Sequence, residues 1–209
     1  MAKQRLENFT CPHCKNARQR PVLEHINVDL APEMREKVQD LSCFEWRCPI
    51  CGKTTLVLDP CLYHDMSNQF MVWLWTEEGD TPDASGFDPL TGYTLRRVDS
   101  PNAFREKIAI LECGLDDRAI EIMKLLLAMQ LQRSGDIVDL LFHAYDERTA
   151  TFRFAAVLSD GSEQYAAMQG DTYARIQRDV SERLFTPAKD FIKIDVDWAT
   201  EVLTLLHDA

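Results

Sequence analysis

Apolar and polar residues alternate clearly near the start of the chain. Ile26, Val28 and Leu30 are separated by single polar residues, and this period of two predicts a strand over residues 21–30. Residues 1–9 are polar and show no such period. Because polar chain ends often fray, this segment is predicted to be a frayed polar leader.

Short elements follow this strand. Pro32 fits the first turn of a helix that is predicted to run to about Leu41. Residues 44–47 and 54–59 are predicted to be strands. Residues 70–75 are six consecutive apolar residues, a run that is typical of a central strand covered on both faces.

A change of composition comes next. Residues 76–92 contain five acidic residues and no Lys or Arg, and they are predicted to be a disordered acidic loop. After a strand at 93–98, Ser100 is the predicted N-cap of a helix that ends near Gly114. Asp116 is predicted to cap a longer helix over about 117–133, whose apolar surface is broad enough to pack on more than one side.

The last third of the chain has a different pattern. Three apolar segments joined by short turns predict an antiparallel meander, with strands at 137–145, 151–158 and 163–168. A helix at about 171–184, a short strand at 191–194 and a helix at about 197–207 are predicted to follow.

Composition places the chain among ordinary globular proteins, with 45% hydrophobic and 27% charged residues. No apolar run approaches the roughly 20 residues that cross a bilayer, so no membrane contact is expected. The N-terminus has no apolar export segment, and the seven cysteines are an odd number. Free or metal-bound thiols in a reducing compartment are therefore expected, and the cytoplasm is the predicted location.

The net charge of −11 argues against a nucleic-acid partner, since a phosphate backbone requires clustered cations. One local exception is basic and contains Lys3, Arg5, Lys15, Arg18 and Arg20. These cations flank the first cysteine pair, where they can neutralise a negatively charged metal–thiolate group. A nucleic-acid surface that uses Lys3, Arg5, Arg18 and Arg20 stays open as an alternative.

The strongest motif is a pair of knuckles, Cys11-Pro12-His13-Cys14 and Cys48-Pro49-Ile50-Cys51. Two Cys-x-x-Cys pairs predict a zinc site with four thiolate ligands, in the strand–knuckle–strand pattern of a zinc ribbon. Because four protein ligands leave no open coordination position, the zinc is predicted to be structural. The knuckles are 33 residues apart, so a strand and a helix are inserted between them.

Two other possibilities concern reactive side chains. Cys-Pro-His-Cys is also a redox motif, but that chemistry places the first thiolate at a helix N-terminus, and residues 15–21 have no helical pattern. A redox switch that releases zinc remains an alternative. Tyr63, His64 and Asp65 are a candidate enzyme site, although His64 and Asp65 more often cap a turn.

The two Cys-Pro-x-Cys knuckles, the segment Leu30-Ala31-Pro32-Glu33-Met34 and the later Tyr63-His64-Asp65-Met66 resemble the CpXC protein family. The stretch from Arg96 to Arg118 is similar to the continuation of that family. The resemblance covers about residues 9–131 and implies a zinc-ribbon-like domain in a bacterial cytoplasmic protein. It supplies no catalytic residues. The first knuckle departs from an ideal ribbon, since Lys15 stands where a glycine is usual.

These observations predict an α+β protein with two domains. Residues 9–133 form a β-rich, zinc-ribbon-containing domain with helices and the acidic loop 76–92, and residues 134–209 form a small antiparallel sheet with two helices. The favoured function is a non-enzymatic protein-interaction module with a structural zinc at Cys11, Cys14, Cys48 and Cys51. The alternatives are an enzyme with a site near Tyr63, His64 and Asp65, and a zinc ribbon that binds nucleic acid.

Overall fold

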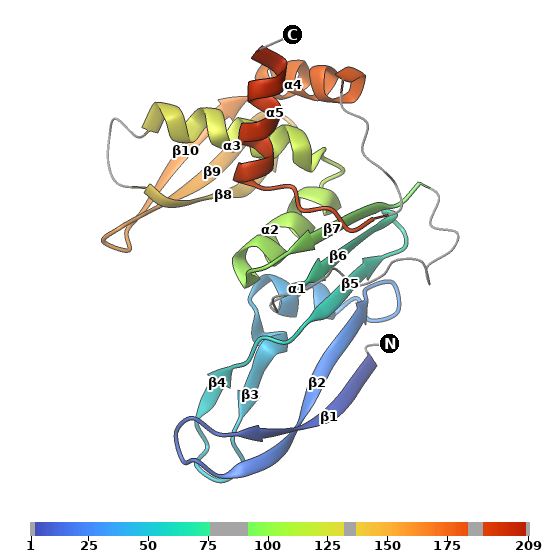
Figure 1. Ribbon diagram of the computed structural model, residues 1–209, viewed down its shortest axis with the longest axis vertical. Coiled ribbons are helices and arrows are strands. Elements are labelled where there is room, and N and C mark those ends of the chain that lie inside the picture. Colours follow the sequence, from blue (N-terminus) through green and yellow to red (C-terminus); the bar gives the residue numbers. More distant parts are fainter. Residues whose placement is uncertain (1–2, 76–91, 132–136, 184–189, 208–209) are drawn as a thin grey trace. The chain divides into compact units, whose positions relative to one another are not determined.

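The computed structural model describes residues 3–75, 92–131, 137–183 and 190–207 (Figure 1). Within these ranges the fold is mixed α+β, with sheets of five, three and two strands, as the sequence predicts. The chain divides into two compact units. Unit 1 contains residues 1–105 and 188–192, and unit 2 contains residues 106–187 and 193–209. The two-domain boundary near residue 133 stays a prediction, and residues 76–91 of the acidic loop lie outside the described ranges.

The five-stranded sheet of unit 1 has the strand order β1-β2-β5-β6-β7. Its β1–β2 and β5–β6 pairs are antiparallel, and its β2–β5 and β6–β7 pairs are parallel. The strands are β1 (Lys3–Thr10), β2 (Ala17–Asn27), β5 (Cys61–Asp65), β6 (Phe70–Leu74) and β7 (Thr94–Val98). The strand predicted at 191–194 does not form. Ile192 makes an isolated β-bridge with Arg96 of β7 instead.

The prediction of a frayed leader at residues 1–9 is wrong. Lys3–Thr10 forms β1, which pairs with β2 along its whole length. The first knuckle closes the two strands into a hairpin, and backbone hydrogen bonds between strands need no apolar pattern in the sequence. A cross-strand ion pair of 2.9 Å between Arg5 and Glu24 adds to the pairing.

The strand predicted over 21–30 ends earlier than expected. β2 stops at Asn27, whose side-chain oxygen accepts hydrogen bonds from the N–H groups of Asp29 (3.1 Å) and Leu30 (3.2 Å). An Asn side chain that bonds to the backbone two residues ahead turns the chain locally. Leu30 consequently points to solvent, with 64% of its surface exposed.

The smaller elements of unit 1 connect β2 to β5. The second hairpin pairs β3 with β4 in antiparallel register, and the helix predicted to reach Leu41 ends two residues sooner. The bounds are α1 (Met34–Gln39), the 3-10 helix η1 (Ser42–Phe44), β3 (Glu45–Arg47) and β4 (Thr54–Leu56).

One face of the five-stranded sheet carries the aromatic core of unit 1. Tyr63 stacks on Phe70 with ring centroids 5.9 Å apart, and it meets Phe104 edge-on at 6.3 Å. Phe104 belongs to α2 (Pro101–Glu112), a helix that continues across the boundary into unit 2. Ser100 accepts a hydrogen bond from the N–H of Ala103 at 3.2 Å, which confirms the predicted N-cap.

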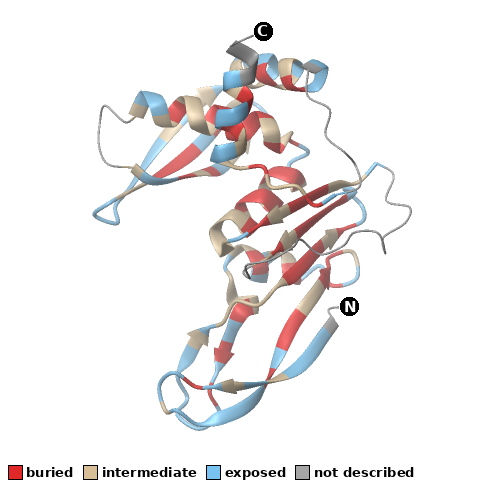
Figure 2. Cartoon of the chain, viewed as in Figure 1, coloured by how far each residue is buried: buried red, intermediate tan, exposed pale blue. Residues whose placement is uncertain are grey.

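The apolar run at 70–75 is a buried strand, as predicted. β6 lies inside the sheet between β5 and β7, and four of its five residues expose at most 2% of their surface: Phe70, Met71, Val72 and Leu74. Figure 2 shows buried residues gathered along β5 and β6. Trp73 is half-buried and packs against Phe191 with ring centroids 5.2 Å apart.

Unit 2 contains the predicted antiparallel meander, with the strand order β10-β9-β8. Phe152 and Phe154 mark the face of the sheet that packs in one cluster with Met123, Val180 and Val202 of the three helices. The other face carries exposed side chains such as that of Arg153. The bounds are α3 (Asp117–Leu131), β8 (Ile137–Asp146), β9 (Thr151–Leu158), β10 (Glu163–Gln169), α4 (Gly170–Arg183) and α5 (Val196–His207).

Candidate metal centre

The first knuckle is the turn between β1 and β2. The N–H of Cys11 donates to the carbonyl of Asn16 at 3.1 Å, and the N–H of Lys15 donates to the carbonyl of Cys11 at 2.9 Å. This tight turn requires a positive φ of 61° at Lys15, a conformation that side chains with a Cβ adopt at a cost. The turn brings Cys14 back beside Cys11.

The second knuckle repeats these contacts between β3 and β4. The N–H of Cys48 donates to the carbonyl of Lys53 at 2.9 Å, and the N–H of Gly52 donates to the carbonyl of Cys48 at 2.9 Å. Gly52 has a φ of 69° and occupies the position that Lys15 occupies in the first knuckle. The two turns therefore have equivalent backbone bonding although they share only the Cys-Pro-x-Cys motif.

The fold brings all four predicted cysteines together. The sulfurs of Cys11 and Cys51 are 3.8 Å apart, and those of Cys14 and Cys48 are 3.7 Å apart. All four sulfurs lie within 4.8 Å of one another. Cys11 and Cys48, the first cysteine of each knuckle, are fully buried, whereas the second cysteine of each is more open to solvent.

These separations match a four-sulfur metal site. Zinc–sulfur bonds of about 2.3 Å in a tetrahedron give sulfur–sulfur edges of about 3.8 Å. The pairs at 3.7 and 3.8 Å join one knuckle to the other, so an ion at the centre would link the two hairpins. The residues therefore fit a metal ion with thiolate ligands, held by Cys11, Cys14, Cys48 and Cys51.

Hydrogen bonds from the knuckles favour thiolates at two of these sulfurs. The side chain and then the backbone N–H of Asn16 lower the pKa of Cys14 to about 6. The backbone N–H groups of Cys51 and Ile50 lower the pKa of Cys48. Donors aimed at sulfur stabilise the ionised form, which is the form that binds metal.

Aromatic packing and one ion pair connect the two hairpins next to the cysteines. Phe9 of β1 meets Trp46 of β3 edge-on, with ring centroids 5.2 Å apart, in the same cluster as the buried cysteines. Arg20 lies 5.0 Å from the centre of the Phe9 ring and forms two hydrogen bonds of 2.6 Å to Asp59. Asp59 follows β4, so this contact ties the first hairpin to the end of the second.

A model of the CpXC protein family matches residues 9–124, which is more than half of the chain and includes both knuckles. The chain belongs to the CpXC protein family. No curated protein matches the CpXC chain, and no solved structure matches it. None of the helices in the described part of the chain combines the length and the hydropathy that a membrane-spanning helix needs.

The basic residues near the first knuckle of the CpXC protein are partly neutralised by carboxylates. Arg20 is only 5% exposed and is paired with Asp59. Arg5 is paired with Glu24 at 2.9 Å and Glu7 at 3.4 Å. Arg18, which also belongs to the predicted nucleic-acid surface, is exposed. Its guanidinium group donates a hydrogen bond to the carbonyl of Ala17 in the same strand.

The structure separates the residues of the candidate enzyme site. Successive residues of β5 point to opposite faces of the sheet. Tyr63 and Asp65 are fully buried on the core face, so His64 lies on the other face. Asp65 accepts a hydrogen bond from the N–H of Asn68 and pairs with Arg35, each at 2.9 Å. Asp65 is therefore the turn cap that the sequence favoured.

A second group of side chains surrounds His64 on its own face. The imidazole is 3.3 Å from the hydroxyl of Tyr93 and is stacked at 5.9 Å on His25 of the neighbouring strand β2. Burial lowers the pKa of His64 below 6.5, although Asp29 and Asp65 partly oppose this effect. No sequence pattern indicates this group, because His25 and Tyr93 are distant from His64 along the chain.

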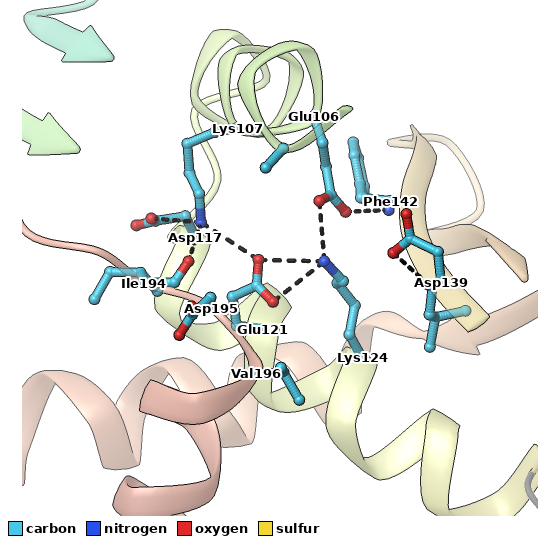
Figure 3. Close-up of polar contacts among 12 residues, drawn as sticks. Glu106, Lys107, Asp117, Glu121, Lys124, Asp139, Phe142, Ile194, Asp195 and Val196 are labelled. Atoms are coloured by element: carbon cyan, nitrogen blue, oxygen red, sulfur yellow. Dashed lines mark hydrogen bonds and ion pairs between the residues drawn. The ribbon is translucent and has the colours of Figure 1, made fainter. Parts of the chain in front are cut away.

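A buried network of charges in unit 2 was not predicted from the sequence (Figure 3). Lys107 of α2 contacts Asp117 at 3.1 Å, Glu121 at 3.4 Å and the carbonyl of Ile194 at 2.9 Å. Lys124 of α3 contacts Glu106 at 2.9 Å and Glu121 at 3.2 Å. Each of the five charged side chains exposes less than 15% of its surface.

The family match ends at Lys124, so it includes all five charges of this network. Glu106 also accepts a hydrogen bond of 2.5 Å from the N–H of Phe142 in β8. The network thus joins α2 and α3 to β8 and to the segment before α5. The sequence contained one sign of this network. Glu121 and Lys124 interrupt the apolar surface of a helix that packs on several sides, and charges at such positions indicate buried ion pairs.

Proposed function

We propose that the four thiolates bind one zinc ion, which holds the two hairpins together, and that the chain works as a non-enzymatic protein-interaction module. The observation that carries this proposal is the sulfur geometry, with cross-knuckle distances of 3.7 and 3.8 Å. An all-thiolate tetrahedral set is one that zinc prefers in structural sites.

The same geometry supports a structural role for the zinc. Four protein ligands fill the coordination shell and leave no position for a substrate or a water molecule. Cys11 and Cys48 are buried in one apolar cluster with Trp46, so half of the ligands are shielded from solvent. The ion would then stabilise hairpins whose own apolar core is small.

Metal analysis of the purified protein tests the zinc centre. The wild-type chain should contain one zinc ion per molecule, and Cys48→Ser should lose zinc and the ordered structure of β1–β4. Cys113→Ser is a matched control, because Cys113 is exposed and outside the cluster. A Cys48→Ser protein that is free of metal and as stable as the wild type would refute the structural zinc.

Exposed apolar side chains on the second hairpin support a protein partner. Ile50, inside the knuckle, is 52% exposed, and Leu56 of β4 is 47% exposed. A metal-held hairpin presents such side chains on a rigid support, which lowers the entropy cost of binding. These residues supply the apolar contacts of the proposed interaction surface.

A paired substitution tests the partner surface. Ile50→Asp with Leu56→Asp should retain zinc and the wild-type melting temperature but lose a protein that copurifies with the wild type from the native cell. Leu30→Asp is the control, since Leu30 is also exposed but lies outside both hairpins. Equal recovery of every copurifying protein with the double variant would contradict this surface.

A further inference from the structure

Strand β1 is an outer edge of the five-stranded sheet. Its pairing with β2 is regular from Gln4 to Thr10, with an irregularity only between Lys3 and Gln4. The strand contains no proline, and Leu6 at its middle exposes 68% of its surface. Proteins usually protect an edge strand with a bulge, a proline or a repelling charge, so the charges of β1 decide whether it can pair.

Two opposite charges flank Leu6. Arg5 and Glu7 lie on the same face of β1, because they are two residues apart. Their side chains are 49% and 41% exposed and lie 3.4 Å from each other, and each has another partner within the chain, Arg5 with Glu24 at 2.9 Å and Glu7 with Arg20 at 3.8 Å. Both charges therefore keep surface that a further partner can contact.

We propose that two copies of the chain associate by antiparallel pairing of their β1 strands about a two-fold axis at Leu6. In this register Arg5 lies opposite Glu7 of the second copy, and Glu7 lies opposite Arg5 of the second copy. The exposed Leu6 side chains meet at the axis. Opposite charges that face each other across two strands attract, and like charges repel.

Charge complementarity favours one register of the two strands, and it favours a second copy of the chain as the partner of β1. A two-fold register centred on Arg5 or on Glu7 would place two like charges directly opposite each other. The register centred on Leu6 pairs both charges with opposite ones and also covers the exposed leucine. A second copy supplies this complementarity by symmetry, since an isologous contact uses the same patch twice. The association extends each five-stranded sheet into a continuous sheet across the axis.

This association is distinct from the proposed metal centre and is tested on metal-loaded protein. Sedimentation of the wild type over a wide range of concentrations should show a reversible monomer–dimer equilibrium. Glu7→Arg places like charges opposite each other twice per dimer and should raise the dimer dissociation constant by roughly tenfold or more. Arg5→Glu combined with Glu7→Arg should restore dimerisation, because the exchanged charges are again complementary.

The control for these charge changes is Glu182→Arg, which makes the same charge change on an exposed residue of α4 and should leave the dissociation constant unchanged. Metal content and melting temperature are measured for every variant, so that loss of the hairpin is distinguished from loss of the dimer. A wild type that stays monomeric at all concentrations overturns the proposal. A dimer that is insensitive to Glu7→Arg overturns it as well.

Cross-linking tests the register directly. In the proposed dimer the two Leu6 positions are opposite each other, about 5 Å apart at Cα, and Leu6→Cys should form an intermolecular disulfide through the introduced thiols under mild oxidation. The two Asn8 positions are about 14 Å apart at Cα in this register, beyond the reach of a disulfide. Asn8→Cys is therefore the matched control. Equal cross-linking at the two positions, or none at position 6, overturns the register.

Discussion

Lys15 and Gly52 occupy equivalent positions in the two knuckles, and both have a positive φ. Glycine adopts this conformation freely because it has no Cβ, whereas other residues lose roughly 1–2 kcal/mol there. A side chain at position 52 would not clash with its neighbours, because an added Cβ would have its nearest contact at 4.0 Å, with Arg47. The cost of replacing Gly52 therefore comes from its backbone conformation. The two knuckles therefore have the same turn but differ in backbone strain.

We predict that Lys15→Gly raises the free energy of unfolding by up to about 1 kcal/mol, because strain is relieved while some chain entropy is lost. Gly52→Ala should lower it by about 1 kcal/mol or more for the converse reason. Urea unfolding of the metal-loaded protein measures both changes. Lys15→Ala removes the same charge and keeps the Cβ, so a stabilising effect of this control would point to charge and not to backbone strain.

His64 predicts a pH dependence of stability. Its pKa is lowered in the folded protein, mainly by burial, so the unfolded chain takes up the proton more readily. A depressed folded pKa contributes stability that is present above the unfolded value of about 6.5 and is lost as the pH falls through the folded value. The unfolding free energy of unit 1 should therefore decrease as the pH falls below about 6.5.

Comparison of variants isolates the contribution of His64. We predict that His64→Gln shows a smaller fall in unfolding free energy between neutral and mildly acidic pH than the wild type. Tyr93→Phe keeps the imidazole and removes only the hydroxyl 3.3 Å away, so it should retain most of the dependence. Urea titrations at a series of pH values measure the three slopes, and identical slopes for His64→Gln and the wild type would refute the assignment.

At the level of elements, buried charges join the helices of unit 2. Lys107 is 2% exposed and contacts Asp117, Glu121 and a backbone carbonyl. Removal of one partner from a buried ion pair leaves the other charges without compensation, which costs about 3–5 kcal/mol. These contacts therefore fix how α2, α3 and the segment before α5 pack, even though an apolar replacement of the whole network can be equally stable.

We predict that Lys107→Met lowers the free energy of unfolding by about 3–5 kcal/mol, because Asp117 and Glu121 stay buried and both lose their contact with the Lys107 ammonium group. Lys193→Met is the matched control. Lys193 is 35% exposed and pairs with Asp195 at 2.9 Å, and exposed pairs contribute only about 0–1 kcal/mol. Chemical denaturation followed by circular dichroism compares the two, and equal losses would show that burial does not decide the effect.

At the level of the whole molecule, all four predicted metal ligands belong to unit 1. The apolar cluster of unit 2 includes buried residues from α2, α3, α4 and α5 and from its sheet, and it uses no cysteine of the knuckles. Metal binding is coupled to the folding of the part of a protein that supplies its ligands. Removal of metal should therefore affect the two units differently.

We predict that a chelator increases backbone hydrogen exchange in peptides from β1–β4, while peptides from β8–β10 keep their protection. Loss of the central ion removes the link between the two hairpins, beside which Phe9, Trp46 and Val57 pack around the thiols. Exchange measured by mass spectrometry, with and without added zinc, checks this. Equal deprotection of both sets of peptides would show that the metal supports the entire fold.

The sequence alone determined features that depend on near neighbours. The Cys-Pro-x-Cys motifs predicted two equivalent turns, and the four cysteines predicted one cluster. The run at 70–75 predicted the buried strand β6, and the three apolar segments joined by short turns after residue 137 predicted the meander. The turns and strands depend on signals within a few residues, because turn geometry and the period of side chains along a strand are local properties. The cluster was predicted across 33 residues because one zinc ion requires four ligands and each knuckle offers two.

Only the tertiary structure decided what depends on distant neighbours. β1 forms because β2 is its partner, and α3 packs with the sheet that follows it in one apolar cluster. The alternation of β5 places His64 beside His25 and Tyr93 and away from Tyr63 and Asp65. Lys107 donates a hydrogen bond to the carbonyl of Ile194, which is 87 residues away in the sequence. Such contacts form only when the chain folds back on itself, and no local pattern records which residues will then meet.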